Sequence, residues 1–280
     1  MTSKIMLITG AGRGIGAQTA KLAATRGYRV VVNYLQNQAA AAEVVAQIEA
    51  AGAQALMLQA DVGQSAEVDR LFETVDQSWG PIDVLVNNAG IVDTFSIVDA
   101  TPDNVIRSFQ ANVFSAYYCS REAVKRMSTQ HGGKGGVIGN MSSVAARLGS
   151  MPAGNAYTST KAALDGFNLA LAHEVGPQGI RVCGVRPGII ATDIQNSRGG
   201  IEKAAEIAAV ATTLGRIGQP EEVAETVDRH LDIGVTGDLL DETNDGIVVH
   251  DPETGEILEV NGRYCELTGY DRETLVGDDI

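Results

Sequence analysis

Over its first 190 residues the chain alternates short apolar runs rich in Val, Ile and Leu with longer segments whose apolar residues recur every three or four positions. The short runs predict β-strands, and the longer periodicity predicts amphipathic α-helices. Strands are expected at Ile5–Thr9, Arg29–Asn33, Ala55–Gln59, Ile82–Asn87, Gly136–Met141 and Ile180–Arg186. Helices are expected at Gly16–Arg26, Ala39–Ala51, Ala66–Trp79, Asn104–Met127 and Ala156–Val175. This order predicts the α/β class, with a doubly wound parallel sheet and helices on both faces.

Charge divides the chain into two unequal parts. Residues 1–225 carry 20 acidic and 18 basic side chains, a net charge of −2. The remaining residues carry the other 15 of the 35 acidic side chains and 3 of the 21 basic ones, a net charge of −12. Such asymmetry predicts segments of different character. We place one domain at residues 1–226 and a short acidic α+β appendage at residues 227–280.

Composition excludes several classes of function. A total charge of −14 argues against a nucleic-acid partner, which would require clustered Lys and Arg. No apolar run approaches the ~18 residues of a membrane span. Cys119, Cys183 and Cys265 lie far apart and fit no zinc or redox spacing. We therefore expect a cytoplasmic protein with reduced thiols, no metal site and no membrane contact.

A glycine-rich turn directly follows the first expected strand and opens the first expected helix. It reads Thr9-Gly10-Ala11-Gly12-Arg13-Gly14-Ile15-Gly16. Glycines there allow a tight turn and let the backbone approach a pyrophosphate, which lies at the positive end of the helix. This position predicts a dinucleotide site in a Rossmann-like fold. Its residues are Gly10, Gly12, Arg13, Gly14, Ile15 and Gly16.

Tyr157 and Lys161 form a candidate acid/base pair. They are four residues apart, so they share one face of the expected helix. A lysine ammonium beside a phenol favours the phenolate and lowers a pKa that is ordinarily about 10. Tyr157 is thus expected to exchange a proton near neutral pH.

These motifs together resemble the classical short-chain dehydrogenase/reductase family. The spacing of Gly10 and Gly14 matches that family rather than the Gly-x-Gly-x-x-Gly fingerprint. Further landmarks occur in the family's order: Asp61-Val62, Asn87-Asn88-Ala89-Gly90, Asn112, Asn140-Met141-Ser142-Ser143, Tyr157-x-x-x-Lys161, Pro187-Gly188 and Thr192. The resemblance implies reversible hydride transfer between a nicotinamide and an alcohol or carbonyl substrate. It also implies a homo-oligomer.

The resemblance assigns catalytic roles to four residues: Asn112, Ser143, Tyr157 and Lys161. Tyr157 transfers the proton, and Lys161 lowers the pKa of Tyr157 and binds ribose. Asn112 completes a proton relay through water to Lys161. The serine usually precedes the tyrosine by thirteen residues in the family. Ser143 precedes Tyr157 by fourteen and Ser142 by fifteen. Ser143 is therefore favoured to hold the substrate oxygen, with Ser142 as the alternative.

The end of the second strand, at Asn33, bears on the identity of the cofactor. An acidic side chain there would bind the ribose diol of NAD, and the run Val30–Tyr34 has none. Arg13 could pair with a 2′-phosphate, so NADP is favoured over NAD, although Arg13 could equally be a solvated charge.

The resemblance also implies the other cofactor contacts. Asp61 and Val62 would hold the adenine, Asn88 and Gly90 the adjacent ribose, Lys161 the nicotinamide ribose, and Ile190 and Thr192 the carboxamide. Asn33, Ala89, Tyr157, Pro187 and Gly188 complete the expected set.

The substrate is less constrained by the sequence. Residues Ile194–Leu214 are expected to form a mobile lid, and they are rich in Ala, Ile and Gly. This composition favours an apolar or modestly polar carbonyl compound. The string Gly215–Val223 resembles both 3-oxoacyl carrier-protein reductase-like and glucose dehydrogenase-like members, and these act on different substrates.

The family pattern stops near residue 226. The expected apolar helix turns polar at Asp228–Asp232, so we expect the C-terminal helix and last strand of the family to be lost. Only Val235–Asp241 faintly resembles that strand. Residues 239–277 instead resemble the start of a PAS sensory domain, with a short helix, strands at 245–251 and 257–261 around a turn at 252–255, and the run Cys265–Tyr270.

The PAS-like tail leaves several interpretations open. It covers less than half of a PAS domain, and an isolated hairpin is marginally stable. A truncated or chimeric appendage is favoured over a replacement edge strand or an interaction segment. Two other functions compete with the enzyme: a catalytically silent dinucleotide-binding regulator and an inactive fusion product. The intact set of Asn112, Ser143, Tyr157 and Lys161 favours the enzyme.

Overall fold

The structure is a computed structural model that describes residues 3–149, 153–212, 214–231, 248–250, 257–260, 265 and 271–276. The chain divides into two compact units, Met1–Leu231 and Asp232–Ile280. The boundary expected after residue 226 falls inside the last helix of the first unit. The assignment of all chemistry to residues 1–226 stays a prediction.

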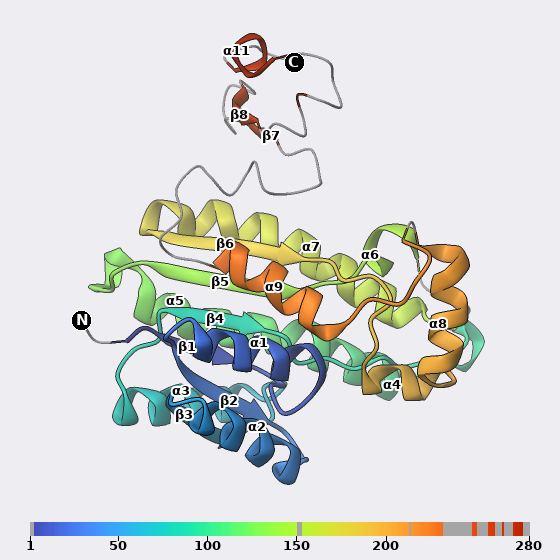
Figure 1. Cartoon of the computed structure of the whole chain (residues 1–280), viewed down its shortest axis with the longest axis horizontal. Helices are drawn as coiled ribbons and strands as arrows, with labels where there is room; N and C mark the ends of the chain where they lie inside the picture. The colour runs from blue at the N-terminus through green and yellow to red at the C-terminus, as the bar shows by residue number, and fades with distance from the viewer. Residues whose placement is uncertain are drawn as a thin grey trace. The chain divides into compact units, whose positions relative to one another are not determined.

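The first unit contains a six-stranded parallel sheet (Figure 1). Its strands are β1 (Ile5–Ile8), β2 (Arg29–Tyr34), β3 (Ala55–Gln59), β4 (Val84–Asn87), β5 (Gly136–Met141) and β6 (Ile180–Val185). They lie in the order β3-β2-β1-β4-β5-β6. Five parallel pairings join them, so the predicted fold class is confirmed for the first unit.

Helices connect the strands in the expected order. They are α1 (Gly14–Thr25), α2 (Gln38–Ala50), α3 (Ser65–Ser78), α4 (Pro102–Phe109), α5 (Ser115–Met127), α6 (Ala145–Leu148), α7 (Asn155–Val175), α8 (Gly200–Ala211) and α9 (Pro220–Leu231). Single turns of 3₁₀-helix occur at Ile97–Asp99, Thr129–His131 and Gly176–Gln178, and a longer one at Asp193–Arg198. The helix expected at Asn104–Met127 is divided into α4, a π-helical turn at Gln110–Phe114, and α5. None of the helices in the described ranges is long and apolar enough to span a lipid bilayer.

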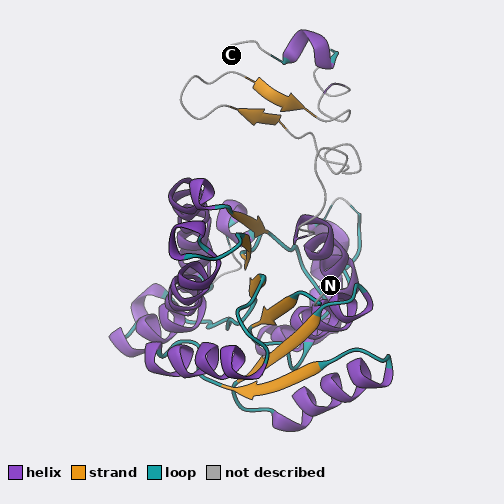
Figure 2. Cartoon of the chain, turned by 90° about the vertical axis from the view of Figure 1, so that its left-hand side faces the viewer, coloured by secondary structure: helices purple, strands orange, loops and turns teal. Residues whose placement is uncertain are grey.

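Alternation along each strand builds two hydrophobic layers. Leu7 and Leu85 face one layer, which α3, α5 and α7 cover. Ile8 and Val86, their immediate neighbours in sequence, face the other layer, which α1, α2 and α9 cover. Successive side chains of a strand point to opposite faces, so a sheet buried on both sides requires strands that are apolar throughout. Figure 2 shows the sheet between its two layers of helices.

The order of strands reverses between β1 and β4. β1 pairs with β2 on one side and with β4 on the other, and all these pairings are parallel. Ligands of open α/β sheets bind outside the carboxyl ends of the strands at such a reversal. The glycine-rich turn after β1 and the segment after β4 meet at that point, which therefore positions the candidate site.

The expected loss of the C-terminal helix is wrong. Helix α9 is complete to Leu231, with Val223, Ala224, Val227 and Leu231 buried. The polar residues Asp228, Arg229 and His230 occupy positions between these apolar ones, so the helix is amphipathic rather than disrupted. Leu231 packs against Gly139 of β5, and Arg181 of β6 donates to the carbonyl oxygen of His230 at 2.8 Å.

The described part of the second unit is a short hairpin and one helical turn. β7 (Val248–His250) pairs antiparallel with β8 (Ile257–Val260), which confirms the expected hairpin, although both strands are shorter than expected. Asp271 accepts from the backbone nitrogen of Thr274 at 2.8 Å at the start of α11 (Arg272–Leu275). The expected short helix, the turn at 252–255, the run 266–270 and the strand-like segment 235–241 lie outside the described residues.

The docking of α9 can be tested by cavity formation. Leu231 is 2% exposed, so Leu231→Ala is expected to lower the free energy of unfolding of the first unit by about 2–5 kcal/mol. Leu169→Ala on α7 is the matched control, because Leu169 is 68% exposed and its loss is expected to change stability by less than about 0.5 kcal/mol. Urea unfolding followed by fluorescence of Trp79, the single tryptophan, measures both. Equal effects of the two variants would contradict this docking.

Candidate active site

Three glycines shape a cradle at the start of α1. Gly10 and Gly14 have φ of +63° and +56°, a region that favours glycine. A Cβ atom on Gly16 would lie 2.5 Å from Asn88 Nδ2 and 2.7 Å from the carbonyl oxygen of Gly10. Within the described helix α1 the first turn holds no acidic residue and no side chain caps the end. The backbone amides there fit a pyrophosphate, so these residues could hold a dinucleotide.

Hydrogen bonds join the segments that follow β1 and β4, the two strands at the reversal. Thr9 Oγ1 accepts from the backbone nitrogens of Asn88 and Ala89, each at 3.0 Å. Asn88 Nδ2 donates to the carbonyl oxygens of Thr9 at 2.9 Å and Gly10 at 3.2 Å. The side chain of Asn88, expected at the ribose, therefore holds the glycine cradle in place.

Asn33 also supports the cradle through its side chain. The residue is 1% exposed, and its Oδ1 accepts from the backbone nitrogen of Gly10 at 3.2 Å. Its Nδ2 donates to the carbonyl oxygens of Leu58 and Ala60, at 3.3 and 3.2 Å. The amide thus joins β2, the end of β3 and the cradle, and its hydrogen bonds are made within the protein.

Side-chain hydrogen bonds also fix the backbone of the turn after β3. Asp61 Oδ1 accepts from the backbone nitrogen of Gly63 at 2.9 Å, and the nitrogen of Asp61 donates to Glu67 Oε2 at 2.7 Å. Val62 is 6% exposed and packs into the hydrophobic layer under α3 and α5. Asp61 is half-buried, whereas the Val62 side chain belongs to the core.

The segment after β6 forms the opposite side of the cradle. The carbonyl oxygen of Pro187 accepts from the backbone nitrogen of Val144 at 3.1 Å. Gly188 has open space where a Cβ atom would be. Further along, Ile190 forms a parallel bridge with Gly218, and Thr192 lies against Gly14, whose Cβ position would be 3.3 Å from Thr192 Cγ2. The expected carboxamide-binding segment therefore runs beside the glycine cradle.

Arg13, expected at a 2′-phosphate, is paired with an acidic residue. Its Nη1 lies 3.5 Å from Asp193 Oδ2, and the two side chains are 68% and 58% exposed. Asp193 immediately follows Thr192, so the ion pair joins the cradle to the segment that leads into α8.

Lys161 is the most buried cation of the site. It is 4% exposed, and its Nζ donates to the carbonyl oxygen of Met141 at the end of β5, at 2.7 Å. Burial lowers the pKa of Lys161 to about 8, while the charge of Asp165 one turn later opposes that shift. Asp165 is itself held by Arg186, whose Nε lies 2.8 Å from Asp165 Oδ2.

Tyr157 lies on the same side of α7 as Lys161. Lys161 Nζ is 5.7 Å from the centroid of the Tyr157 ring, which is half-buried. The i, i+4 spacing of the helix brings these groups together, as the sequence predicts. The structure thereby joins a phenol and a buried ammonium at the carboxyl end of β5.

The two serines after β5 have different partners. Ser142 Oγ donates to the carbonyl oxygen of Lys161 at 3.1 Å, which ties α7 to β5. Ser143 Oγ accepts from the backbone nitrogen of Ala145 at 3.2 Å, which leaves its O–H bond available to donate. These contacts favour Ser143 as the residue that meets a substrate oxygen.

Asn112 lies in the π-helical turn at Gln110–Phe114, a feature that often marks functional sites. Its Oδ1 accepts from the backbone nitrogen of Ile91 at 2.8 Å, and its Nδ2 donates to the Ile91 carbonyl oxygen and to Thr160 Oγ1, each at 3.0 Å. A Cβ atom on Gly90 would lie 2.8 Å from Asn112 Oδ1 and 3.7 Å from Lys161 Nζ. Asn112 and Lys161 therefore approach the same point beside Gly90. The water relay between them stays a prediction.

Sequence reasoning missed three contributors: Thr9, Thr160 and Asp193. Thr9 stood in the glycine-rich run, but its hydroxyl has no sequence signal of its own. Thr160 Oγ1 donates to the carbonyl oxygen of Tyr157 at 2.7 Å and accepts from Asn112, so it links two of the catalytic candidates. Asp193 contributes only through a partner 180 positions away, which no local pattern reveals.

Across the ranges that the structure describes, no three His, Cys, Asp or Glu side chains gather closely enough to hold a metal ion. The cradle, the reversal of strand order and the Tyr157–Lys161 pair instead define an α/β protein of the dinucleotide-dependent oxidoreductase class.

Comparison with known proteins identifies the family. Residues 4–202 match the short chain dehydrogenase family, and residues 238–280 match a PAS domain family. The chain belongs to the short-chain dehydrogenase/reductase family. It is an NAD(P)-dependent oxidoreductase acting on CH–OH or C=O groups.

Several relatives cover most of the chain. Uncharacterized oxidoreductase YgfF of Escherichia coli is 45% identical over 224 residues, with 80% of this chain and 90% of the relative covered. A 3-oxoacyl-[acyl-carrier-protein] reductase of Synechocystis is 39% identical, with 81% and 88% covered. A short chain dehydrogenase from Burkholderia cenocepacia, solved in complex with NADP, superimposes with a TM-score of 0.72 at 32% identity, over 81% of this chain and 90% of that one.

The burial of Lys161 predicts a pH-dependent stability. Between about pH 8 and 10.5 the folded state releases the Lys161 proton while the unfolded state keeps it, so stability rises with pH in that window. From pH 7 to 9.5, the free energy of unfolding of the wild type should rise by about 2 kcal/mol relative to Lys161→Met. Urea unfolding at both pH values measures this.

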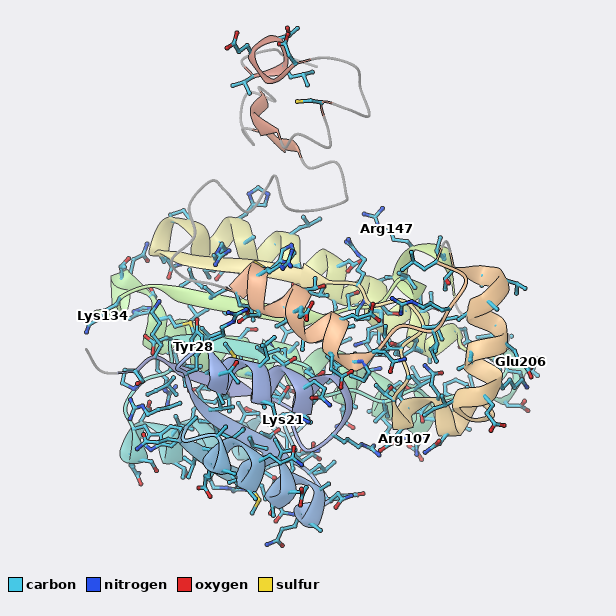
Figure 3. The ribbon with its side chains drawn as sticks, viewed as in Figure 1. Lys21, Tyr28, Arg107, Lys134, Arg147 and Glu206 are labelled. Atoms are coloured by element: carbon cyan, nitrogen blue, oxygen red, sulfur yellow. The ribbon has the colours of Figure 1, made fainter. Side chains whose placement is uncertain are left out.

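The control is a lysine away from the site. Lys134 precedes β5 and is exposed, and Figure 3 shows it at the opposite end of the sheet from Glu206 of α8. Lys134→Met should track the wild type at both pH values. A constant difference between wild type and Lys161→Met would contradict the burial of a charged Lys161.

Proposed function

We propose that the chain catalyses NADP(H)-dependent, reversible hydride transfer between the nicotinamide and an alcohol or carbonyl carbon, with Tyr157 as general acid/base. The buried Lys161 ammonium carries this proposal, since it is held on the Met141 carbonyl oxygen 5.7 Å from the Tyr157 ring centroid. A cation at that place stabilises negative charge on the phenol oxygen.

Tyr157 handles the proton in both directions. In reduction its hydroxyl donates a proton to the carbonyl oxygen, and in oxidation its phenolate accepts the proton of the alcohol. The nicotinamide, when bound, supplies or accepts the hydride. Ser143 donates a hydrogen bond to the same substrate oxygen, because its own oxygen already accepts from Ala145. The substrate oxygen is thereby oriented between the two hydroxyl groups.

Lys161 and Asn112 assist Tyr157, one by stabilising its phenolate and the other by completing a path for protons. Lys161 stabilises the phenolate by its charge and binds the nicotinamide ribose. Asn112, held by Ile91 and Thr160, completes a water-mediated path to Lys161. Thr160 is a positioning residue, since its hydroxyl contacts Asn112 and the backbone of Tyr157.

NADP(H) is the proposed cofactor. The glycine cradle receives the pyrophosphate, and Arg13 beside it offers a guanidinium to the 2′-phosphate. The buried amide of Asn33 stands where an NAD-specific chain would have an acidic residue, and it offers no repulsion to a phosphate. The complex of the Burkholderia cenocepacia relative with NADP supports this choice. The adenosine half of the cofactor would bind against the turns after β3 and β4, which contain Asp61, Asn88 and Gly90.

The proposed substrate is a small carbonyl or alcohol compound with an apolar body. Apolar side chains are exposed on the segments that follow β4, β5 and β6 in sequence: Ile97, Val98, Leu148, Ile201, Val210 and Leu214. Exposed apolar side chains that gather at one end of a sheet favour a binding site over plain surface. The segment 194–214 is the proposed lid, and most of it forms α8.

We also propose a cytoplasmic homo-oligomer in which residues 1–226 carry the chemistry. All three cysteines are free thiols, as expected of a reducing compartment. Phe114 of the π-helical turn and Tyr117 of α5 expose apolar surface that a second copy could bury. The PAS-like tail has no assigned part in the reaction.

Replacing Tyr157 tests the proton step. Tyr157→Phe is expected to lower kcat/KM by about 10²- to 10⁴-fold, because only the hydroxyl group is removed. The assay is a panel of ketones, aldehydes and sugars with NADPH and NADH in parallel. Tyr117→Phe, on the exposed face of α5, is the control and should retain activity. NADPH binding by Tyr157→Phe should persist, and wild-type turnover by that variant would refute the assignment.

A second comparison separates the two serines. Ser143→Ala should lower kcat by about 10²-fold or more, since a donor to the reacting oxygen is lost. Ser142→Ala should lower thermal stability and leave kcat within about tenfold, because Ser142 Oγ donates to the Lys161 backbone. The reverse ranking of kcat would assign the substrate oxygen to Ser142.

A further inference from the structure

The ion pair between Arg13 and Asp193 crosses the mouth of the glycine cradle. Arg13 Nη1 lies 3.5 Å from Asp193 Oδ2. Arg13 is the residue before Gly14, and Thr192, the residue before Asp193, lies against Gly14. The close approach of the two backbones therefore places the carboxylate within reach of the guanidinium.

The backbone on each side of Asp193 is anchored. The nitrogen of Ala191 donates to the carbonyl oxygen of Gly218, and the nitrogen of Thr192 donates to that of Ile190, each at 2.9 Å. Gln195 is 5% exposed, and its Nε2 donates to the Ile190 carbonyl oxygen at 2.9 Å. These hydrogen bonds fix the backbone on both sides of Asp193 and so hold its carboxylate beside Arg13.

Asp193 is the acidic side chain that the structure pairs with Arg13. Within the described first turns of α1 and α2, the structure contains no acidic side chain. The first turn of α2 is close, since a Cβ atom on Gly12 would lie 3.5 Å from the backbone nitrogen of Ala41. Asp193 is accordingly the acidic side chain that competes with an incoming anion for Arg13.

The pair is exposed enough to exchange partners. Its side chains are 68% and 58% exposed, and a solvated ion pair contributes little to stability. A phosphate monoester brings a charge of about −1.5 to −2 and three acceptor oxygens, so it forms stronger, charge-assisted hydrogen bonds with a guanidinium. The guanidinium can therefore leave Asp193 for a 2′-phosphate, although that exchange requires the ion pair to break.

We propose that Asp193 is a cofactor-specificity residue: it holds Arg13 in the cofactor-free protein and thereby reduces the preference for NADP(H) over NAD(H). This inference rests on the proposed use of Arg13 for the 2′-phosphate. NAD(H) lacks that phosphate and leaves the ion pair intact, so Asp193 weakens the binding of only one of the two cofactors.

The test is a double-mutant cycle on the full chain. NADPH and NADH are titrated into the wild type, Asp193→Asn, Arg13→Gln and the double variant, and the quenching of Trp79 or the rise in cofactor fluorescence gives each Kd. Asp193→Asn should tighten NADPH binding by about two- to fivefold and leave the Kd for NADH unchanged. In the Arg13→Gln background the same substitution should change neither Kd by more than about 1.5-fold, since no guanidinium remains to be released.

A matched control removes the same charge elsewhere. Asp228 on α9 pairs with Arg26 at 3.0 Å, away from the cradle. Asp228→Asn should leave the ratio of the two Kd values unchanged. Circular dichroism of each variant verifies that the fold is retained.

The outcomes separate this inference from the function on which it rests. If Arg13→Gln weakens NADPH and NADH equally, the proposed role of Arg13 is wrong and the role of Asp193 fails with it. If Arg13→Gln weakens NADPH selectively but Asp193→Asn leaves the ratio unchanged, only the role of Asp193 is overturned. Equal effects of Asp193→Asn with and without Arg13 would also overturn it, since they would reflect direct repulsion of the phosphate.

Discussion

Parallel pairing of the strands brings all six carboxyl ends to one edge of the sheet, and most segments of the candidate site directly follow one of those ends. The glycine cradle follows β1, the Asn88–Gly90 turn follows β4, the serines follow β5 and the Pro187–Thr192 segment follows β6. Residues that are more than 170 positions apart meet there because the hydrogen bonding of the sheet dictates it. The strand reversal between β1 and β4 then decides where at that edge a dinucleotide fits.

Much of the polar chemistry at this edge supports the backbone. Thr9, Asn33 and Asn88 use their side chains to fasten the cradle to three neighbouring strands or turns. Ser142 does the same between β5 and α7. Such buried hydrogen bonds rigidify a site, because each leaves an unsatisfied polar group when it breaks. A rigid cradle would be required for the proposed placement of a nicotinamide beside Tyr157.

Burial of Lys161 connects the stability of the protein to its proposed catalysis. The protein desolvates an ammonium and compensates it only partly, with the Met141 carbonyl oxygen and the charge of Asp165. That arrangement opposes folding while Lys161 is charged, yet it supplies a cation where the phenolate of Tyr157 would form. Local destabilisation of this kind is common where a site is organised for chemistry rather than for packing.

The sequence predicted the six strands, the main connecting helices, the glycine cradle and the Tyr157–Lys161 pair, because these depend on local periodicity and short spacings. It misjudged α9, since Asp228–His230 look like a disrupted helix until the apolar positions around them are seen to face the sheet. The three-dimensional packing was needed to show that Asn33 and Asn88 form hydrogen bonds within the protein, that Thr160 links Asn112 to Tyr157, and that Asp193 pairs with Arg13. These contacts join residues far apart in the chain, and no local pattern encodes which distant groups the packed sheet will bring within hydrogen-bonding distance.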